Sequence, residues 1–271
     1  MPLPALPLIL EPDQLEEILH NDDLLIVDVC QPGVYERVHV PGAVHINPGA
    51  LVCGTPPAPG KLPDEARLNE LFSSIGYDPG KHIVAYDDEG GGWAGRFLWT
   101  LDVIGHKGYS YLNGGIHAWN NEGHPVESDV ISPDPGKHAV VINHEPIADL
   151  SQVLAQIPDT NSVVWDARSA EEYQGLKSGS ARKGHIPGAV NLDWLDTMDA
   201  SSNFRLLPLG ALRQKLEALG IGKDQKVITH CQSHHRSGLT YLIGKALGLD
   251  IRAYDGSWSE WGNREDTPVE T

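Results

Sequence analysis

A cysteine lies at the centre of the stretch whose residue types and spacing most strongly suggest chemistry. The apolar run that begins at Val227 is typical of a buried strand, Cys231 follows it, and a helical pattern begins near Ser237. In a parallel sheet, ligands bind outside the carboxyl ends of the strands. The following helix offers free N–H groups and about half a positive charge, and Arg236 adds a full charge. We therefore expect the strand end to expose Cys231 and its pKa to fall below the ~8.5 of a free thiol, which makes it a candidate nucleophile.

Two other interpretations of this stretch were open. Free cysteines are often buried as small apolar residues, but the basic residues that follow Cys231 are difficult to bury. Zinc accepts the side chains of His230, Cys231, His234 and His235. However, His230 and Cys231 are adjacent and point to opposite faces of a strand, and no CxxC or HxxxH spacing supports them. We expect no metal, and we place His234 and His235 on the rim of the pocket, where their charge changes near neutral pH.

The spacing of Cys231 and Arg236 limits the size of what the loop can hold. A cysteine and an arginine at a strand–loop–helix junction are similar to the Cys-x5-Arg loop of cysteine phosphatases, which wraps a phosphate. Here the spacing is Cys-x4-Arg, one residue shorter. The smaller ring favours a single sulfur atom over a phosphate group.

The other two cysteines, Cys30 and Cys53, lack such surroundings, and we expect both to be structural. Three widely spaced cysteines argue against a disulfide framework and for a reducing compartment. Residues 1–10 are apolar but contain three prolines and no basic residue, so we expect an extended arm rather than a signal peptide or a membrane span. These features predict a cytoplasmic protein.

The overall charge restricts the partners of the chain. Its 271 residues include 20 Lys and Arg but 37 Asp and Glu, which gives a formal net charge of −17 at pH 7. Such a surface repels nucleic acids and anionic membranes, so neither is an expected partner. A small anionic substrate would need a local positive pocket.

Four sequence blocks recur in the same order in the two halves of the chain. The pairs are 24–28 with 162–166, 39–44 with 185–190, 82–86 with 226–230, and 113–119 with 255–261. Both halves then close with Pro-Val-Glu, at 125–127 and 268–270. The repeat indicates two copies of one fold of ~130 residues.

Each copy alternates apolar runs with segments of helical period. The runs, expected as buried strands, are 24–27, 83–86, 163–165 and 227–229, and the helical segments are 68–75, 212–219 and 237–247. This alternation predicts an α/β fold with two tandem domains, each a mainly parallel sheet flanked by helices. We place the N-terminal domain at 1–128, a linker at 129–148 and the C-terminal domain at 149–271. Residues 140–142 are either a short strand or part of the linker.

The chain resembles the tandem-domain rhodanese sulfurtransferases in four features. These are the duplication, the His-x-Pro-Gly-Ala blocks, the strand-end Cys231 and the sequence Asp255-Gly-Ser-Trp-Ser-Glu-Trp261. The resemblance covers nearly the whole chain, and the loop Cys231-Gln-Ser-His-His-Arg236 is similar to that of a subgroup of bacterial rhodaneses. The family implies an active C-terminal domain and an inactive N-terminal one. The sequence agrees, because Asp87 stands at the position that matches Cys231 and cannot carry sulfur.

The resemblance also implies a reaction. The thiolate takes the outer sulfur of thiosulfate, releases sulfite, and passes the sulfur from a persulfide to cyanide or a thiol, without a cofactor. Cys231 and Arg236 are the expected catalytic residues. The expected substrate-binding residues are Arg182, Gln232, Ser233, His234 and His235. Trp194 and Lys183 could line the cleft, but we favour a structural or surface role for each. The bulk of His234 argues against a mercaptopyruvate pocket.

The sequence leaves two other functions open. In the first, the chain is a sulfur-carrier module in which Cys231 only holds and delivers a persulfide. In the second, it is a cysteine phosphatase-like hydrolase, a function that the short loop disfavours. The expected partners are small molecules, namely thiosulfate with cyanide or thiols, and a low-molecular-weight or protein thiol that accepts sulfur. We expect a monomer.

Overall fold

The computed structural model describes residues 3–271, and this part of the chain divides into two compact units. Unit 1 holds the residues up to Leu51, Pro63–Asn143 and Asp199–Leu206, whereas unit 2 holds Val52–Leu62, His144–Met198 and Leu207–Thr271. The main division, after Asn143, falls inside the predicted linker. The predicted domains differ from the units in two short segments, 52–62 and 199–206, each of which packs with the other half of the chain.

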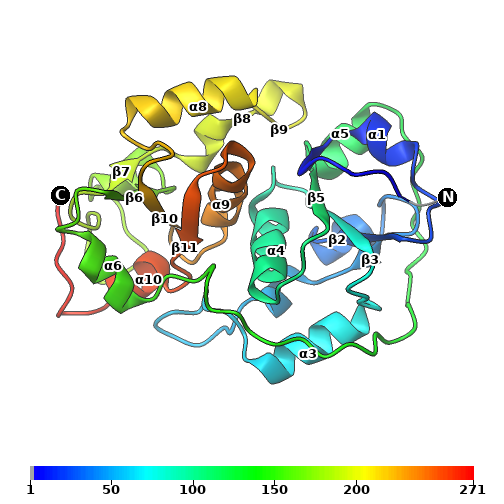
Figure 1. Ribbon diagram of the computed structural model, residues 1–271, viewed down its shortest axis with the longest axis horizontal. Coiled ribbons are helices and arrows are strands. Elements are labelled where there is room, and N and C mark those ends of the chain that lie inside the picture. The colour runs from blue at the N-terminus through cyan, green and yellow to red at the C-terminus, as the bar shows by residue number, and fades with distance from the viewer. Residues whose placement is uncertain (1–2) are drawn as a thin grey trace. The chain divides into compact units, whose positions relative to one another are not determined.

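Unit 1 is built on a parallel sheet, part of which Figure 1 shows as β2, β3 and β5. Among the described residues the sheet has five strands, in the order β1-β5-β4-β2-β3. The strands are β1 (Ile9–Leu10), β2 (Leu24–Asp28), β3 (Val44–His45), β4 (His82–Tyr86) and β5 (Tyr109–Leu112). β2 and β4 are almost continuously apolar and buried because helices cover both faces of the sheet.

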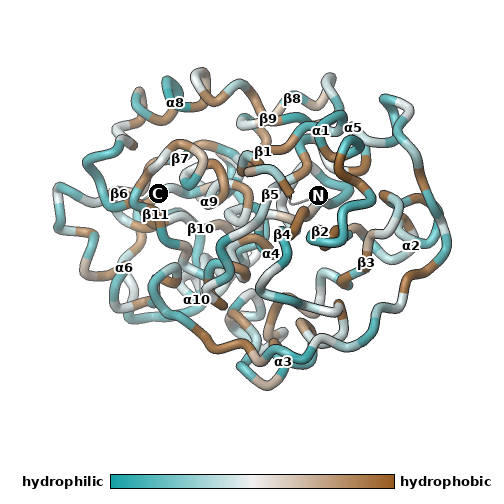
Figure 2. Tube along the Cα trace, turned by 45° about the vertical axis from the view of Figure 1, so that its right-hand side comes forward, coloured by the Kyte–Doolittle hydropathy of each residue, from teal (hydrophilic) through white to brown (hydrophobic). Residues whose placement is uncertain are grey.

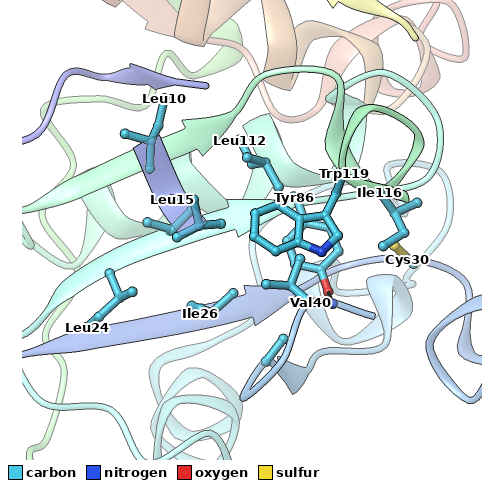
Figure 3. Close-up of a cluster of buried hydrophobic side chains, with 12 residues drawn as sticks. Leu10, Leu15, Leu24, Ile26, Cys30, Val40, Tyr86, Leu112, Ile116 and Trp119 are labelled. Carbon is cyan, nitrogen blue, oxygen red and sulfur yellow. Dashed lines mark hydrogen bonds between the residues drawn. The ribbon is translucent and has the colours of Figure 1, made fainter. Parts of the chain in front are cut away.

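The helices of unit 1 pack on opposite faces of this sheet. Alternate residues of β2 and β4 join α1 and α5 in one core, in which Trp119 is central and Cys30 is buried (Figure 3), while α4 contacts β4 and β5. The helices are α1 (Pro12–Glu16), α2 (Pro32–Tyr35), η1 (Pro48–Leu51), α3 (Glu65–Ser74), α4 (Gly92–Val103) and α5 (Gly115–Asn121). The helix predicted at 68–75 corresponds to α3, which Asp64 caps by accepting a hydrogen bond from the Arg67 N–H.

Unit 2 repeats this plan with a parallel sheet of four strands among the described residues, in the order β11-β10-β6-β7. Its strands are β6 (Ser162–Asp166), β7 (Val190–Asn191), β10 (Lys226–His230) and β11 (Asp250–Ala253). Its helices are α6 (Leu150–Gln156), α7 (Ala170–Tyr173), η2 (Trp194–Thr197), α8 (Leu209–Ala218), α9 (Arg236–Leu247) and α10 (Ser257–Trp261). In the chain between η2 and α8, the short β8 (Met198–Asp199) and β9 (Arg205–Leu206) pair around η3 (Ala200–Ser202). Apart from Met198, these residues belong to unit 1.

The helices predicted at 212–219 and 237–247 correspond to α8 and α9. Along α8 the hydropathy changes repeatedly, as Figure 2 shows, and only Leu212 and Leu216 are buried. α9 is buried along most of its length and ends at Gly248, whose φ of 72° is in the left-handed region that favours glycine.

The two sheets share one register at the centre. Asp28 of β2 is paired with Tyr86 of β4, and Asp166 of β6 is paired with His230 of β10 in the same way. Asp87 and Cys231, the next residues along β4 and β10, therefore occupy corresponding positions in the two units.

Two of the recurring sequence blocks prove to be one structural motif. The imidazole of His185 stacks on Tyr173 with ring centroids 3.7 Å apart, and its backbone forms a bridge with Glu270. The Glu270 carboxylate also accepts the Gly188 N–H at 3.1 Å. Unit 1 repeats these contacts with His39, Tyr35, Gly42 and Glu127. The Pro-Gly turn and the closing Pro-Val-Glu thus hold each unit together.

Most of the predicted linker packs against unit 1. The Gly136 N–H donates to the Ser73 carbonyl of α3 at 2.8 Å, and the Asn69 side chain bonds both backbone groups of Val140. Residues 140–142 form no strand. Among residues 3–271, none of the helices combines the length and the apolar character needed to cross a bilayer.

Candidate active site

Cys231 lies between the end of β10 and the start of α9, as the sequence predicted. Its side chain is not exposed at the strand end, because the residue is only 1% accessible. The expectation of an exposed thiol is therefore wrong. Residues from several other segments of unit 2 hold the loop from Cys231 to Arg236 in place.

The block that begins at Asp255 holds the first part of the loop. The Trp258 N–H donates to the Cys231 carbonyl at 3.0 Å, and the Ser259 N–H donates to the Gln232 carbonyl at 2.9 Å. The Gln232 side chain donates to Ser180 Oγ at 3.1 Å. These contacts give a physical role to a block that the sequence analysis used only as a family mark.

The electrostatic surroundings of Cys231 oppose its burial. Burial alone raises the pKa of the thiol, but the charge of Arg236, the hydroxyl and N–H groups of Ser237, and His235 all lower it. The net pKa lies below the ordinary value, so the predicted direction agrees with the structure. Ser237 lies in the first turn of α9 and was not among the predicted site residues.

Arg236 is anchored by a carboxylate that the sequence analysis did not identify. Its guanidinium donates to both carboxylate oxygens of Glu172, at 2.7 and 2.9 Å. Burial raises the pKa of Glu172, but Arg236 and the Ser169 backbone lower it more strongly, to about 2. Glu172 also belongs to the capping box of α7 with Ser169, a spacing that the sequence displays. That spacing predicts a helix start but not the ion pair.

The two histidines of the loop have different surroundings. His234 is fully buried, has a φ of 53°, and forms a hydrogen bond from Nδ1 to Ser237 Oγ at 2.8 Å. The interpretation of His234 as a rim residue is wrong, because its left-handed backbone accompanies a side chain that packs inward. His235 is half-buried, with its ring 5.7 Å from that of Trp194 in an edge contact.

Arg182 has partners in another part of unit 2. Its guanidinium donates to the carbonyls of Trp261 at 2.9 Å and Thr267 at 2.7 Å, and also to the Thr267 hydroxyl. These bonds tie Arg182 to the segment that follows α10. Its expected role in binding substrate stays a prediction. Lys183 is exposed and Trp194 is buried.

A buried ionic cluster supports the loop that holds Cys231. Arg168 is fully buried and bonds the Asp166 carboxylate at 2.6 Å, while its guanidinium lies 4.3 Å from the centre of the Trp258 ring. His230 Nε2 is 3.6 Å from the same carboxylate. Burial raises the pKa of Asp166, but His230 and Arg168 bring it below the ordinary value. This cluster fixes Trp258, which in turn holds the Cys231 carbonyl.

The corresponding loop of unit 1 is occupied by its own carboxylate. Asp87 accepts the N–H groups of Glu89, Gly91 and Ala94 at 3.1, 2.8 and 2.9 Å. Burial and the charge of Glu89 raise the pKa of Asp87 to about 6 despite these bonds. Unit 1 therefore has the donors of a reactive loop, but an acid side chain already uses them.

The remaining cysteines offer no comparable nucleophile. Burial and the charge of Asp28 raise the pKa of Cys30 far above its ordinary value. Cys53 contacts the backbone carbonyls of Ala58 and Pro59 through its sulfur. Within residues 3–271, no group of three or more His, Cys, Asp or Glu side chains is arranged to hold a metal ion.

Comparison with known proteins identifies what the chain is similar to. The model of the rhodanese-like domain matches twice, over residues 11–122 and 149–264. A thiosulfate sulfurtransferase of Azotobacter vinelandii is 46% identical over 267 residues, which are 98% of each chain. One of Pseudomonas aeruginosa is also 46% identical, over 98% of this chain and 97% of its own.

A solved structure supports the fold. The anaerobic ergothioneine biosynthesis enzyme of Chlorobium limicola superimposes with a TM-score of 0.88, over 97% of this chain and 70% of its own. The identity is 18%, so this likeness shows the architecture alone.

Proposed function

Because this chain belongs to the rhodanese-like family and carries two of its domains, we propose that it is a thiosulfate sulfurtransferase in which Cys231 of unit 2 carries the sulfur. The observation that supports this assignment of the site is a cysteine of lowered pKa between a parallel strand and a helix N-terminus. The corresponding residue of the other domain, Asp87, has no sulfur.

The first half-reaction forms a persulfide. The Cys231 thiolate attacks the outer sulfur of thiosulfate, a new S–S bond forms, and the S–S bond of thiosulfate breaks with its electron pair leaving on sulfite. The product is a Cys231 persulfide anion, so charge and atoms balance. Arg236 and the backbone N–H groups of the loop stabilise negative charge on the attacking and the transferred sulfur.

The second half-reaction returns the thiolate. Cyanide or a thiolate attacks the terminal sulfur of the persulfide, which gives thiocyanate or a new persulfide and restores Cys231. We assign donor binding to Arg182, Gln232, Ser233 and His235, with Arg236 contributing to both binding and catalysis. His234 acts through Ser237, to which it is hydrogen-bonded. No cofactor enters this scheme.

The state of the three cysteines bears on the cellular location that we propose. Cys30, Cys53 and Cys231 form no disulfide within the described part of the chain, which supports a reducing, cytoplasmic location. A monomer that uses a low-molecular-weight or protein thiol as acceptor is the simplest form of this proposal. Sedimentation analysis at working concentration tests the oligomeric state.

The central experiment locates the transferred sulfur. After incubation with thiosulfate, the mass of the protein should rise by one sulfur atom on the peptide that contains Cys231, and cyanide should remove that mass as thiocyanate. Cys231→Ser should fold and lose both steps, because an alcohol is not ionised here. Cys53→Ser is the matched control and should retain both. Turnover by Cys231→Ser, or label on Cys30 or Cys53, would refute the mechanism.

A second measurement defines the donor. Sulfite release from thiosulfate should be compared with turnover of 3-mercaptopyruvate under the same conditions. The proposal requires thiosulfate to be the better donor. If Cys231 accepts one sulfur atom but cyanide does not sustain turnover, the protein is instead a sulfur carrier.

A further inference from the structure

A segment from the first half of the chain reaches the loop that holds Cys231. Residues Val52–Leu62 belong to unit 2. Lys61 Nζ forms an ion pair with Glu260 Oε1 at 2.6 Å, and the Leu62 N–H donates to Asp255 Oδ2 at 2.9 Å. Both acceptors lie in the block whose backbone holds the Cys231 and Gln232 carbonyls. The segment is thus attached to the support of the reactive loop.

Gly60 is the point at which this segment meets the loop itself. A Cβ atom on Gly60 would lie 2.0 Å from the Ser233 carbonyl oxygen and 2.5 Å from its carbon. The φ of Gly60 is outside the left-handed region, so a left-handed backbone is not the reason for a glycine here. Glycine is therefore required here by the closeness of Ser233 and not by the local turn.

The contact fixes the direction of one peptide group. The built Cβ position is closer to the Ser233 oxygen than to the other Ser233 atoms, so this carbonyl faces Gly60. In a planar trans peptide the N–H points opposite to the C=O, and the N–H of this peptide belongs to His234. It therefore points away from Gly60. The two preceding peptides are fixed in the same manner, since their carbonyls face Trp258 and Ser259.

We propose that Gly60 is a positioning residue for sulfur transfer: it orients the Ser233–His234 peptide so that the His234 N–H serves the sulfur on Cys231. The inference rests on the proposed function, because it assigns this N–H to the negative charge of the thiolate and the persulfide. Successive backbone N–H groups of a turn can bind an anion together, and the carbonyls of the three peptides from Cys231 to His234 are all turned toward other segments. Gly60, which lies in the first half of the chain, orients the third of these peptides.

Gly60→Ala tests the proposal. The added methyl group must displace the Ser233 carbonyl, because a backbone atom cannot move aside as a flexible side chain can. We expect kcat/KM for thiosulfate to fall about 10- to 100-fold, at or below the loss of one oxyanion-hole donor. The loss should lie mainly in kcat, because the N–H serves charge on the reacting sulfur. The pH at which Cys231 is alkylated at half its maximal rate should be higher in the variant than in the parent protein.

Gly210→Ala is the matched control, since Gly210 is on α8 in unit 2, has ordinary φ, and has nothing within 4 Å of its built Cβ. Its kinetics and alkylation profile should equal those of the parent protein. Lys61→Met provides a second test, because it weakens the docking of the segment without adding volume at Ser233. It should shift both readouts in the same direction by a smaller factor.

The outcomes separate this inference from the proposed function. A folded Gly60→Ala protein with parental kcat/KM and alkylation profile overturns the role of Gly60. If Gly60→Ala does not fold, parental readouts of Lys61→Met overturn it. If the parent protein does not accept sulfur from thiosulfate, the proposed function fails, while the alkylation profiles still decide whether Gly60 controls the thiolate.

Discussion

Burial and charge act in opposite directions on the sulfur of Cys231. An apolar, water-free site would keep the thiol protonated, as it does for Cys30 in unit 1. At Cys231 the nearby Arg236 and the donors of Ser237 reverse the result. Both thiols are buried, so the opposite shifts of their pKa values come from the neighbouring charges and hydrogen-bond donors and not from a difference in exposure.

Glu172 should control the reactivity of Cys231 through Arg236. Glu172→Gln removes the charge that fixes the guanidinium, so kcat/KM should fall about 10- to 100-fold, the loss expected when a catalytic group is misplaced. Glu171→Gln changes the neighbouring exposed carboxylate and should have no effect. Equal activity of the two variants would show that Arg236 needs no anchor.

The same residue predicts a pH dependence of stability. The pKa of Glu172 is about 2 in the folded protein and ordinarily 4.5, so its contribution is complete above 4.5 and is lost as the pH falls toward 2. Urea unfolding should therefore separate the parent protein from Glu172→Gln at pH 7, and the gap should narrow between pH 4.5 and pH 2. A gap that widens in acid would contradict the ion pair.

A substitution of Arg182 can show whether this residue binds the donor or only stabilises the fold. If its charge attracts the donor, Arg182→Ala should raise the KM for thiosulfate about 10-fold, as the loss of one charge-assisted hydrogen bond does, with kcat maintained. The bonds to Trp261 and Thr267 also predict a lower melting temperature. A lower melting temperature with an unchanged KM would leave Arg182 as a purely structural residue.

At the scale of helices and strands, local sequence was a good guide. The runs around β2, β4, β6 and β10 are apolar because both faces of each sheet are covered, and glycines follow α3, α8 and α9. The position of Cys231 between strand and helix followed directly. Its burial, the inward packing of His234 and the partner of Arg236 did not, because they depend on contacts between segments far apart in the chain.

The loop between β4 and α4 should be silent in catalysis. Asp87 takes its hydrogen bonds from its own loop, so Asp87→Asn should leave thiosulfate turnover nearly unchanged. Steady-state kinetics with a circular dichroism check of folding will measure this. A large drop in turnover in a folded variant would show that unit 1 takes part in the reaction.

At the scale of the whole molecule, charge sets the response to salt. The net charge of −17 should repel thiosulfate at long range, whereas the proposed binding residues around Arg236 should attract it locally. The Debye length is already about 10 Å at 0.1 M ionic strength, so added salt above that level acts mainly on the local attraction. The KM for thiosulfate should rise between about 0.1 and 1 M ionic strength of an inert salt. A falling KM would mean that long-range repulsion dominates.

Synthesis of the chain runs in one direction, whereas the two units each include a segment from the other half. Residues 52–62 are made well before the rest of unit 2, and residues 199–206 are made well after the rest of unit 1. At about 5–20 residues per second, several seconds separate the emergence of Asn143 from that of Arg205. Until then Glu122 lacks the guanidinium that it binds in the finished protein, and Asn113 lacks the Leu206 N–H. The first unit on the ribosome is therefore incomplete until much of the second has been translated.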